Sequence, residues 1–300
     1  DLVRSRGLGD VYKRQAHLAG AKVYLTANVL VAEEELAGAL ALVDSAWASG
    51  VDAVIVQDLG LARLVRETMP EVRLHASTQM DTHSTATAQT LAGLGFSRVT
   101  LARETPLAQI RAIAAGGGLE VEVFAHGALC YSRSGQCLMS SMIGGRSANR
   151  GLCAQPCRLP YRLRDASGEI VQTPGAHLLS LKDLNTINHL PALVRAGVSA
   201  LKIEGRMKAA EYVALVTGVY RAALDRAIAA PDEFQVLPSE NEILEEAFSR
   251  GFTDGYLNGH GGSLMLGRRR PNNRGVAVGR LVSVEGTRGT IRVERSLGQD

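Results

Sequence analysis

Short runs of apolar and β-branched residues alternate along this chain with longer stretches in which apolar positions recur every three or four residues. The short runs carry few polar residues, as strands buried on both faces do, and the longer stretches have the period of amphipathic helices. The predicted strands are 22–27, 53–57, 73–77, 98–102, 120–125 and 200–204. The predicted helices are 33–48, 61–68, 85–94, 106–115, 183–196 and 209–229. Strict alternation of strand and helix predicts a parallel sheet.

The number of strand–helix units favours an α/β fold of the TIM-like (β/α)8 barrel type over an open sheet. Gly50, Gly95 and Gly197 each follow a helix and precede a strand, as glycines that terminate helices do. The visible units fall short of eight, so a barrel would need about two more strands upstream. We therefore expect an N-terminally truncated barrel.

Composition divides the chain into four parts. Residues 1–15 show no amphipathic period and resemble a translated sequencing-adapter artefact, which is excluded from the fold. The barrel is expected over 16–230, interrupted at 127–161 by a long Cys-rich loop of the kind that is usually functional. A helix and a Gly-rich linker follow over 231–270. Alternating patterns over 271–300 predict the start of a small C-terminal β domain, truncated at its end.

The overall composition is that of a soluble globular protein, with 46% apolar and 21% charged residues and a formal net charge of +3. No apolar run is long enough to predict a membrane-spanning helix, and no segment has the pattern of a signal peptide. We therefore expect a cytoplasmic protein without a membrane partner. In that reducing compartment, clustered cysteines are more often ligands or catalysts than disulfides.

The four cysteines all lie in the long loop, at Cys130, Cys137, Cys153 and Cys157, with the spacing C-x6-C-x15-C-x3-C. Four thiolates on one loop supply a complete ligand set for zinc or for an iron–sulfur cluster. Zinc sites usually show tighter C-x2-C pairs, so the wide first pair suits a larger cluster better. Arginines in the same loop can offset the thiolate charge; they are Arg133, Arg146, Arg150 and Arg158.

Several segments resemble a known family. The run EVFAHGALCYSRSGQCLMS at 122–140 resembles the signature of peptidase family U32, whose members include collagenase-like peptidases. The segments GGRSANRGLCAQPCRLPY at 144–161, LLSLKDLN at 178–185 and LKIEGRMKAAEYV at 201–213 are similar to that family too. The resemblance extends over 21–280, and its Cys/Gly signature is long and specific.

The resemblance implies a TIM-like barrel whose first two strands are missing here. It also implies one of several activities, because some members are peptidases and others support oxygen-independent ubiquinone hydroxylation. Further members support prephenate-dependent 5-hydroxylation of tRNA uridine or 23S rRNA cytidine. The form CAQPCRLPY and the start of a β domain resemble the rRNA-hydroxylating branch most. Several non-peptidase members carry an iron–sulfur cluster on four cysteines, which here implies a 4Fe–4S cluster.

Polar residues at the carboxyl ends of the predicted strands are the other candidates, because active sites of (β/α)8 barrels form there. Candidates for catalysis are His75, Gln79, His126, Lys202 and Glu204. Candidates for substrate binding are Gln57, Asp58, Arg103, Glu104 and Arg206. Histidine titrates near neutrality and suits acid–base catalysis, whereas arginine pairs with a carboxylate such as that of prephenate.

Each candidate also has a structural interpretation. Lys202 and Glu204 alternate along their strand, so both are expected to point into the barrel, where an internal ion pair explains them as well as catalysis does. For Gln79, Asp58 and Arg103, hydrogen bonds that order loops are the better explanation of any single residue. These alternatives stay open on the sequence alone.

Three functions fit the pattern. An Fe–S-dependent RNA hydroxylation enzyme explains the cysteine loop, and the arginines at 268–270 and 274 suit RNA phosphates, although a solvated linker explains them at least as well. A peptidase is the alternative, but neither H-E-x-x-H nor G-x-S-x-G is present, and a Cys130–His126 pair leaves three cysteines unexplained. A non-enzymatic scaffold with a structural metal site, zinc included, is the third.

Overall fold

The computed structural model describes residues 8–259 and 261–294 of the chain. Helix α1 spans Leu8–Leu18, and His17 near its end lies 3.0 Å from the carboxylate of Asp52. The segment interpreted as an artefact, 1–15, thus overlaps a described helix from residue 8 onward, and its first seven residues lie outside the described part. The interpretation of its origin stays a prediction.

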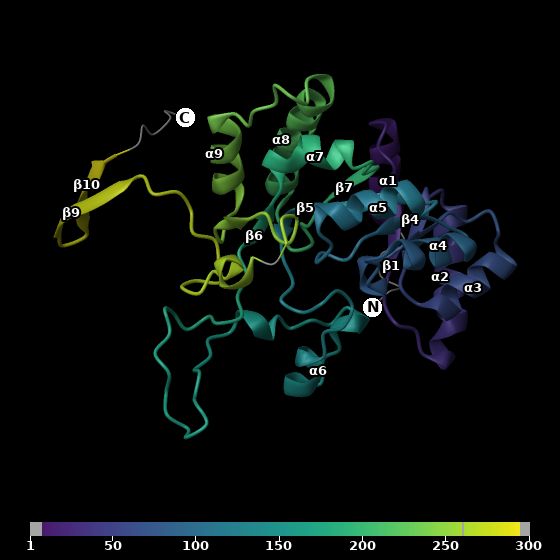
Figure 1. The fold of residues 1–300 in the computed structure, drawn as a ribbon, viewed down its shortest axis with the longest axis horizontal. Coiled ribbons are helices and arrows are strands. Elements are labelled where there is room, and N and C mark those ends of the chain that lie inside the picture. The colour runs from purple at the N-terminus through teal and green to yellow at the C-terminus, as the bar shows by residue number, and fades with distance from the viewer. Residues whose placement is uncertain (1–7, 260, 295–300) are drawn as a thin grey trace.

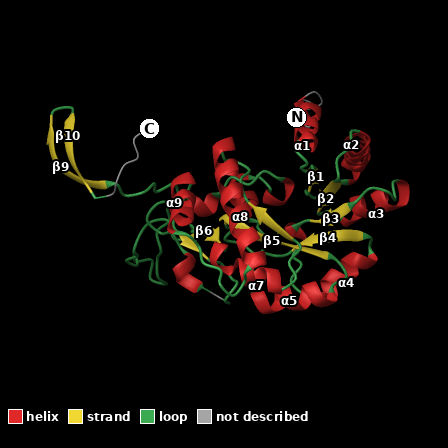
Figure 2. Ribbon diagram, turned by 90° about the horizontal axis from the view of Figure 1, so that it is seen from above, coloured by secondary structure: helices red, strands yellow, loops and turns green. Residues whose placement is uncertain are grey.

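Five parallel strands form the main part of one sheet in chain order (Figures 1 and 2). They are β1 Tyr24–Ala27, β2 Ala53–Val56, β3 Leu74–Ala76, β4 Phe96–Thr100 and β5 Glu120–Ala128. Each coincides with a predicted strand to within a few residues, so the parallel arrangement expected from the alternation of strand and helix is confirmed.

Strand β5 is long enough to carry two neighbours along its other edge. The parallel strand β7 Ala200–Ile203 pairs with its middle, and the antiparallel strand β6 Asp183–Asn185 pairs with its end. The short strand β8 Phe252–Thr253 pairs with β6 and completes eight strands. Within the described residues, β1 pairs with β2 alone. A mixed α/β fold with a mostly parallel sheet is thus confirmed, and closure into a barrel stays a prediction.

The helices that follow the parallel strands pack on one face of the sheet (Figure 2). They are α2 Leu36–Ala48, α3 Leu59–Thr68, α4 Thr85–Gly93 and α5 Leu107–Gly116. Val54, Val56 and Leu74 on the outer face of the sheet share a buried core with Leu61 and Val65 of α3. Alternation along each strand sends the intervening residues to the opposite, inner face.

Three further helices build a second core beside β6 and β7. They are α7 Leu190–Arg195, α8 Ala210–Ala229 and α9 Pro238–Ala247. The helix predicted over 183–196 is wrong in its first part, because Asp183 to Asn185 form β6. Asp183 forms a buried ion pair with Arg250, 2.9 Å apart, and accepts a bond from the Arg250 backbone. That pair belongs to the β6–β8 contact, which local periodicity does not reveal.

The chain ends in a two-stranded antiparallel hairpin that stands apart from the main sheet (Figure 1). Its strands are β9 Gly279–Glu285 and β10 Arg288–Val293. They lie where alternating patterns predict the start of a β domain, and residues 295–300 of that prediction lie outside the described part. No described helix has the length and apolar character needed to cross a membrane.

We expect Asp183→Ala to lower the free energy of unfolding by about 3–5 kcal/mol, because it leaves the buried guanidinium of Arg250 without its partner. Chemical denaturation measures this change. The control is Asp225→Ala, which removes the exposed partner of Arg221 on α8 and should have a much smaller effect. Equal losses in the two variants would show that burial of the first pair does not matter.

Candidate functional site

The cysteine loop, which we define as residues 129–161, lies against the carboxyl ends of β3 and β4. Ser134 sits at the contact, since its hydroxyl donates to the carboxylate of Glu104 at 3.0 Å and accepts from the backbone N–H of Arg103 at 3.2 Å. Gly135 has a φ of +74°, and a Cβ atom there would overlap the carbonyl oxygen of Gln79. A glycine is therefore required where the loop meets the turn after β3.

Arginines fasten other parts of the cysteine loop, which includes helix α6 Met139–Gly144. Arg133 pairs with Asp81 at 2.7 Å, and Arg150 donates to the carbonyl of Leu30 at 3.1 Å. Arg158 donates to the carbonyl of Leu129 at 3.1 Å, which ties the two ends of the loop together. These side chains anchor the loop to the body and to itself. The sequence predicted only that the arginines offset the charge of the thiolates.

The structure brings the four thiols near enough to act on one another electrostatically. Burial raises the pKa of the Cys130 thiol, and the charges of Cys137 and Cys153 raise it further, while Arg103 acts in the opposite direction. Burial likewise raises the pKa of Cys157, which feels all three other cysteines and the opposing charge of Arg158. A raised pKa favours the neutral thiol, so the thiolate form at these two positions depends on a positively charged partner.

Two donors point at one of these sulfurs. The backbone N–H of Gln155 lies 3.4 Å from Sγ of Cys153, and the hydroxyl of Ser140 lies 3.9 Å from the same atom. Donors of this kind stabilise a thiolate and tune a cluster bound to it. Among the described residues, no three His, Cys, Asp or Glu side chains are arranged to enclose one metal ion.

The inner face of the sheet carries charged side chains around the carboxylate of Glu122. Its oxygen accepts from the Thr100 hydroxyl at 2.7 Å and from Nζ of Lys202 at 2.9 Å, and Arg98 lies 3.8 Å away. Burial by itself raises the pKa of Glu122, but the Lys202 charge and these hydrogen bonds outweigh it, so the pKa is lowered. The sequence predicts strands with few polar residues, and the polar groups that they do carry on this face satisfy one another while remaining buried.

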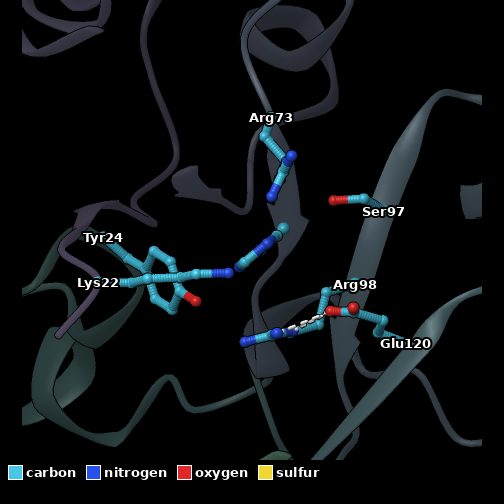
Figure 3. Close-up of a pocket in the computed structure, with 7 residues that line it drawn as sticks. Lys22, Tyr24, Arg73, Ser97, Arg98 and Glu120 are labelled. Atoms are coloured by element: carbon cyan, nitrogen blue, oxygen red, sulfur yellow. Dashed lines mark hydrogen bonds and ion pairs between the residues drawn. The ribbon is translucent and has the colours of Figure 1, made fainter. Parts of the chain in front are cut away.

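A pocket of about 350 Å³ opens on this face at the amino ends of the strands (Figure 3). Its lining is Lys22, Tyr24, Arg73, His75, Ser97, Arg98 and Glu120. Arg98 pairs with Glu120 at 2.7 Å, and the rings of Tyr24 and His75 meet edge to face at 5.0 Å. Burial and the charge of Arg98 lower the pKa of His75 to about 4. The imidazole of His75 is therefore neutral at pH 7 and is a weaker base than a solvated histidine.

Two cations from the candidate set meet over one aromatic ring between the inner face and the cysteine loop. The guanidinium of Arg103 stacks on Phe124 at 4.1 Å, and Nζ of Lys202 lies 5.8 Å from the same ring. Nε of Arg103 is buried, and no hydrogen-bond partner for it occurs among the described residues. The charge of Arg103 also acts to lower the pKa of Cys130, so this cation lies near a thiol.

Other candidates lie elsewhere. His126 is fully buried between rings of α8 and β8, with Nδ1 3.3 Å from the hydroxyl of Tyr220, and burial lowers its pKa to about 4. Asp58 caps α3 by accepting from the N–H of Leu61 at 2.9 Å, which is the loop-ordering role weighed for it. The oxygen of Gln57 is buried and unpaired in the described structure.

Glu204 and Arg206 are the last two candidates. The carboxylate of Glu204 accepts from the backbone N–H of Arg206 at 3.1 Å, a local contact within the turn after β7. The side chain of Arg206 is exposed. Lys202 pairs with Glu122, so the internal ion pair weighed for Lys202 and Glu204 forms with a different acid.

Sequence reasoning missed several members of the polar inner face, among them Tyr24, Arg98 and Thr100. Tyr24 begins β1, Arg98 lies in the middle of β4 and Thr100 ends β4, whereas most of the predicted site residues follow the strands. Alternation was the available signal, since Arg98 and Thr100 are two residues apart, as are Glu120 and Glu122 on the neighbouring strand. Residues at a spacing of two share one face of a sheet.

Comparisons with known proteins agree on one family. The family model described as peptidase family U32 matches residues 10–266. The 23S rRNA 5-hydroxycytidine synthase of Escherichia coli is 42% identical over 279 residues, which cover 90% of this chain and 41% of that protein. The tRNA hydroxylation protein P of Escherichia coli is 33% identical, covering 82% of this chain and 64% of the relative. A collagenase of Porphyromonas gingivalis is 35% identical, covering 80% and 60%. The chain thus spans less than two thirds of each relative.

We expect the stability of the chain to fall as the pH is lowered from about 6.5 to 4. His75 and His126 have a pKa of about 4 in the folded chain and regain a value near 6.5 on unfolding. Within that window the unfolded chain binds more protons than the folded chain. The contribution of the two neutral histidines to the free energy of unfolding is therefore fully present above pH 6.5 and is lost as the pH falls toward 4. Each histidine adds a slope of at most about 1.4 kcal/mol per pH unit.

Unfolding free energies measured across this pH range test the expectation. His75→Gln and His126→Gln should each make the dependence on pH shallower, and the double variant should make it shallower still. An unchanged slope in all three variants would show that these two imidazoles are not held neutral by burial.

Proposed function

This chain belongs to peptidase family U32, and from that membership and the geometry of the site we propose that it is part of an enzyme that hydroxylates a pyrimidine base of rRNA or tRNA at the 5-position. The observation that carries the proposal is the 42% identity to a 23S rRNA 5-hydroxycytidine synthase, which extends across 90% of the chain. That span includes the whole cysteine loop and the strands of the inner face. The activity of the complete protein is inferred from a relative that is more than twice as long as the matched part.

We further propose that Cys130, Cys137, Cys153 and Cys157 hold a 4Fe–4S cluster. The four half-buried cysteines lie near enough for the charge of one to shift the pKa of another, and two donors approach the sulfur of Cys153. Each of these features fits a cluster held by four thiolates. When bound, such a cluster supplies one-electron redox chemistry beside the substrate.

A small carboxylate of the prephenate type is the proposed second substrate. Arg103 and Lys202 both approach the Phe124 ring beside Cys130, and Nε of Arg103 still has a hydrogen to donate. A carboxylate placed there would gain a charge-assisted hydrogen bond from Arg103, while Phe124 keeps the guanidinium planar against the sheet. Lys202 would remain shared with Glu122, so its part is to keep the local charge positive.

Peptidase activity is the alternative function, because a collagenase occurs among the relatives. A thiol peptidase needs a histidine in contact with its cysteine. In the described structure no hydrogen bond joins a cysteine thiol to a histidine, and His126 faces Tyr220 rather than Cys130. The site geometry therefore favours the RNA-modifying function, and a scaffold with a structural metal remains as the outcome if no activity depends on the cysteines.

Anaerobic purification should yield about four iron and four sulfide per chain, with a broad absorption band near roughly 400 nm. Cys130→Ala should lose most of both, because it removes one of four ligands. Ser132→Ala, two residues away in the same loop, is the matched control and should retain the cluster. A folded chain that contains zinc alone would point to a structural site. A folded chain with neither metal would refute the cluster and favour the thiol peptidase.

The proposed reaction is tested with the complete gene in a strain that lacks it. Mass spectrometry of rRNA and tRNA nucleosides should show a 5-hydroxypyrimidine that disappears in the deletion strain and returns with the wild-type gene. Arg103→Gln should restore at least tenfold less of it, since a charge-assisted bond to the substrate contributes about 1.5–3 kcal/mol. Arg111→Gln on the exposed face of α5 is the control and should restore it fully. No change in any hydroxylated nucleoside on deletion would refute the RNA function.

A further inference from the structure

Six exposed arginines follow one another through the linker before β9 and along the terminal hairpin. We call them the arginine strip: Arg269, Arg270, Arg274, Arg280, Arg288 and Arg292. The chain as a whole is nearly balanced, with 33 basic and 30 acidic residues, but no Asp or Glu occurs between Gly255 and Val284. The positive charge is therefore concentrated in this part of the molecule.

Most of these arginines are unneutralised. Arg280 pairs with Glu294 at 3.2 Å, where both side chains are exposed, and it is the one member with an ion pair in the described part of the chain. Other exposed arginines, such as Arg63, Arg195 and Arg221, each pair with a carboxylate. Unpaired guanidinium groups at high local density are the electrostatic signature of a surface that binds a polyanion.

The strip is held to the body by its backbone and is not a free tail. The N–H of Arg274 donates to the carbonyl of Ser249 at 2.8 Å, and the side chain of Asn273 accepts from the N–H of Ser249 at 2.9 Å. Just before the first member, the carbonyl of Arg268 accepts from the N–H of His177 at 3.0 Å. These contacts hold the part of the strip at 269–274, and the hairpin extends from it. A freely solvated linker would not form these backbone hydrogen bonds. They favour the RNA-binding interpretation of these arginines over the solvated linker weighed from the sequence.

One residue connects the strip to the cysteine loop. His177 donates its backbone N–H to the carbonyl of Arg268, and its Nδ1 lies 2.9 Å from the carbonyl oxygen of Arg158. Arg158 directly follows Cys157 in the chain. His177 and Arg158 therefore link the beginning of the strip to Cys157, a proposed cluster ligand.

We propose that the arginine strip binds the phosphate backbone of RNA and presents the strand to the site at the cysteine loop. This inference rests on the proposed RNA substrate and adds the surface that holds it. Arginine forms bidentate bonds with phosphate, and a basic surface without an aromatic platform supplies affinity but little base preference. The hairpin also exposes apolar side chains such as Leu281 and Ile291, which a protein partner would cover, but the unpaired charge favours RNA.

The test is fluorescence anisotropy of a labelled single-stranded RNA of about 20 nucleotides, titrated with this chain between about 50 and 200 mM salt. The logarithm of the association constant should fall steeply with the logarithm of the salt concentration. For single strands each phosphate contact contributes about 0.7 to this slope. The triple variant Arg269→Gln, Arg270→Gln, Arg288→Gln should therefore bind more weakly, with a slope reduced by about 2.

Two variants control for net charge and for folding. The triple variant Arg63→Gln, Arg195→Gln, Arg221→Gln loses the same charge elsewhere and should keep the wild-type slope and affinity. The triple variant Arg269→Lys, Arg270→Lys, Arg288→Lys keeps the charge and should also keep the slope. The proposal is overturned if both glutamine triples weaken binding equally, or if the wild-type chain shows no salt-dependent binding. Capture of the chain by vesicles of phosphatidylserine, without RNA binding, would overturn it in favour of a membrane surface.

The RNA-binding titration and the nucleoside analysis of the deletion strain test two separate proposals. If the strip variant loses RNA affinity while deletion of the gene changes no hydroxylated nucleoside, the surface stands and the proposed reaction fails. If deletion removes the nucleoside but RNA affinity does not depend on the strip, the reaction stands and this surface fails.

Discussion

The buried carboxylate of Glu122 is the group around which the inner face of the sheet is organised. A carboxylate removed from water is unstable unless charges and hydrogen bonds replace its hydration. Thr100 of β4 and Lys202 of β7 supply those partners to β5, and Arg98 adds a second positive charge. Because the three partners come from two neighbouring strands, the ion cluster and the strand register depend on each other. A shift of one residue would turn these groups toward the apolar helices.

The cysteine loop occupies an edge of the sheet that the helices leave uncovered. With the outer face occupied by α2 to α5, the carboxyl ends of β3 and β4 are left open, and Ser134 and Gly135 attach the loop to them. Arg103 belongs to both regions, since its backbone holds Ser134 and its guanidinium lies over Phe124 beside the thiols. The charge of the thiols and the charge of the inner face are therefore coupled through one residue.

The positions of the cations have a consequence for the proposed function. A cluster, a carboxylate and a nucleic acid are all anionic or held by anionic ligands, so a site that gathers them needs a surplus of cations. The inner face supplies Arg103 and Lys202, and the arginine strip supplies unpaired charge on the far side of His177. His126 does not join these cations, since its ring is enclosed by Tyr220 and Phe252. Its neutral state contributes to the fold rather than to the site.

The sequence by itself determined the family, the alternation of strand and helix, and the four-cysteine loop, because each is written in local spacing. Periodicity placed β1 to β5 and β7, since side chains of a buried strand alternate whatever lies beside it. It did not predict the short parallel strand β8, which lies where a linker was expected. It misplaced 183–185, because these residues form a strand by pairing with β5 and β8, both distant in the sequence. Only the tertiary structure decided that Lys202 pairs with Glu122, that Asp58 caps a helix and that Arg98 lies on the polar face. Those are long-range contacts between charged groups, whose partners depend on register and burial rather than on neighbours in the chain.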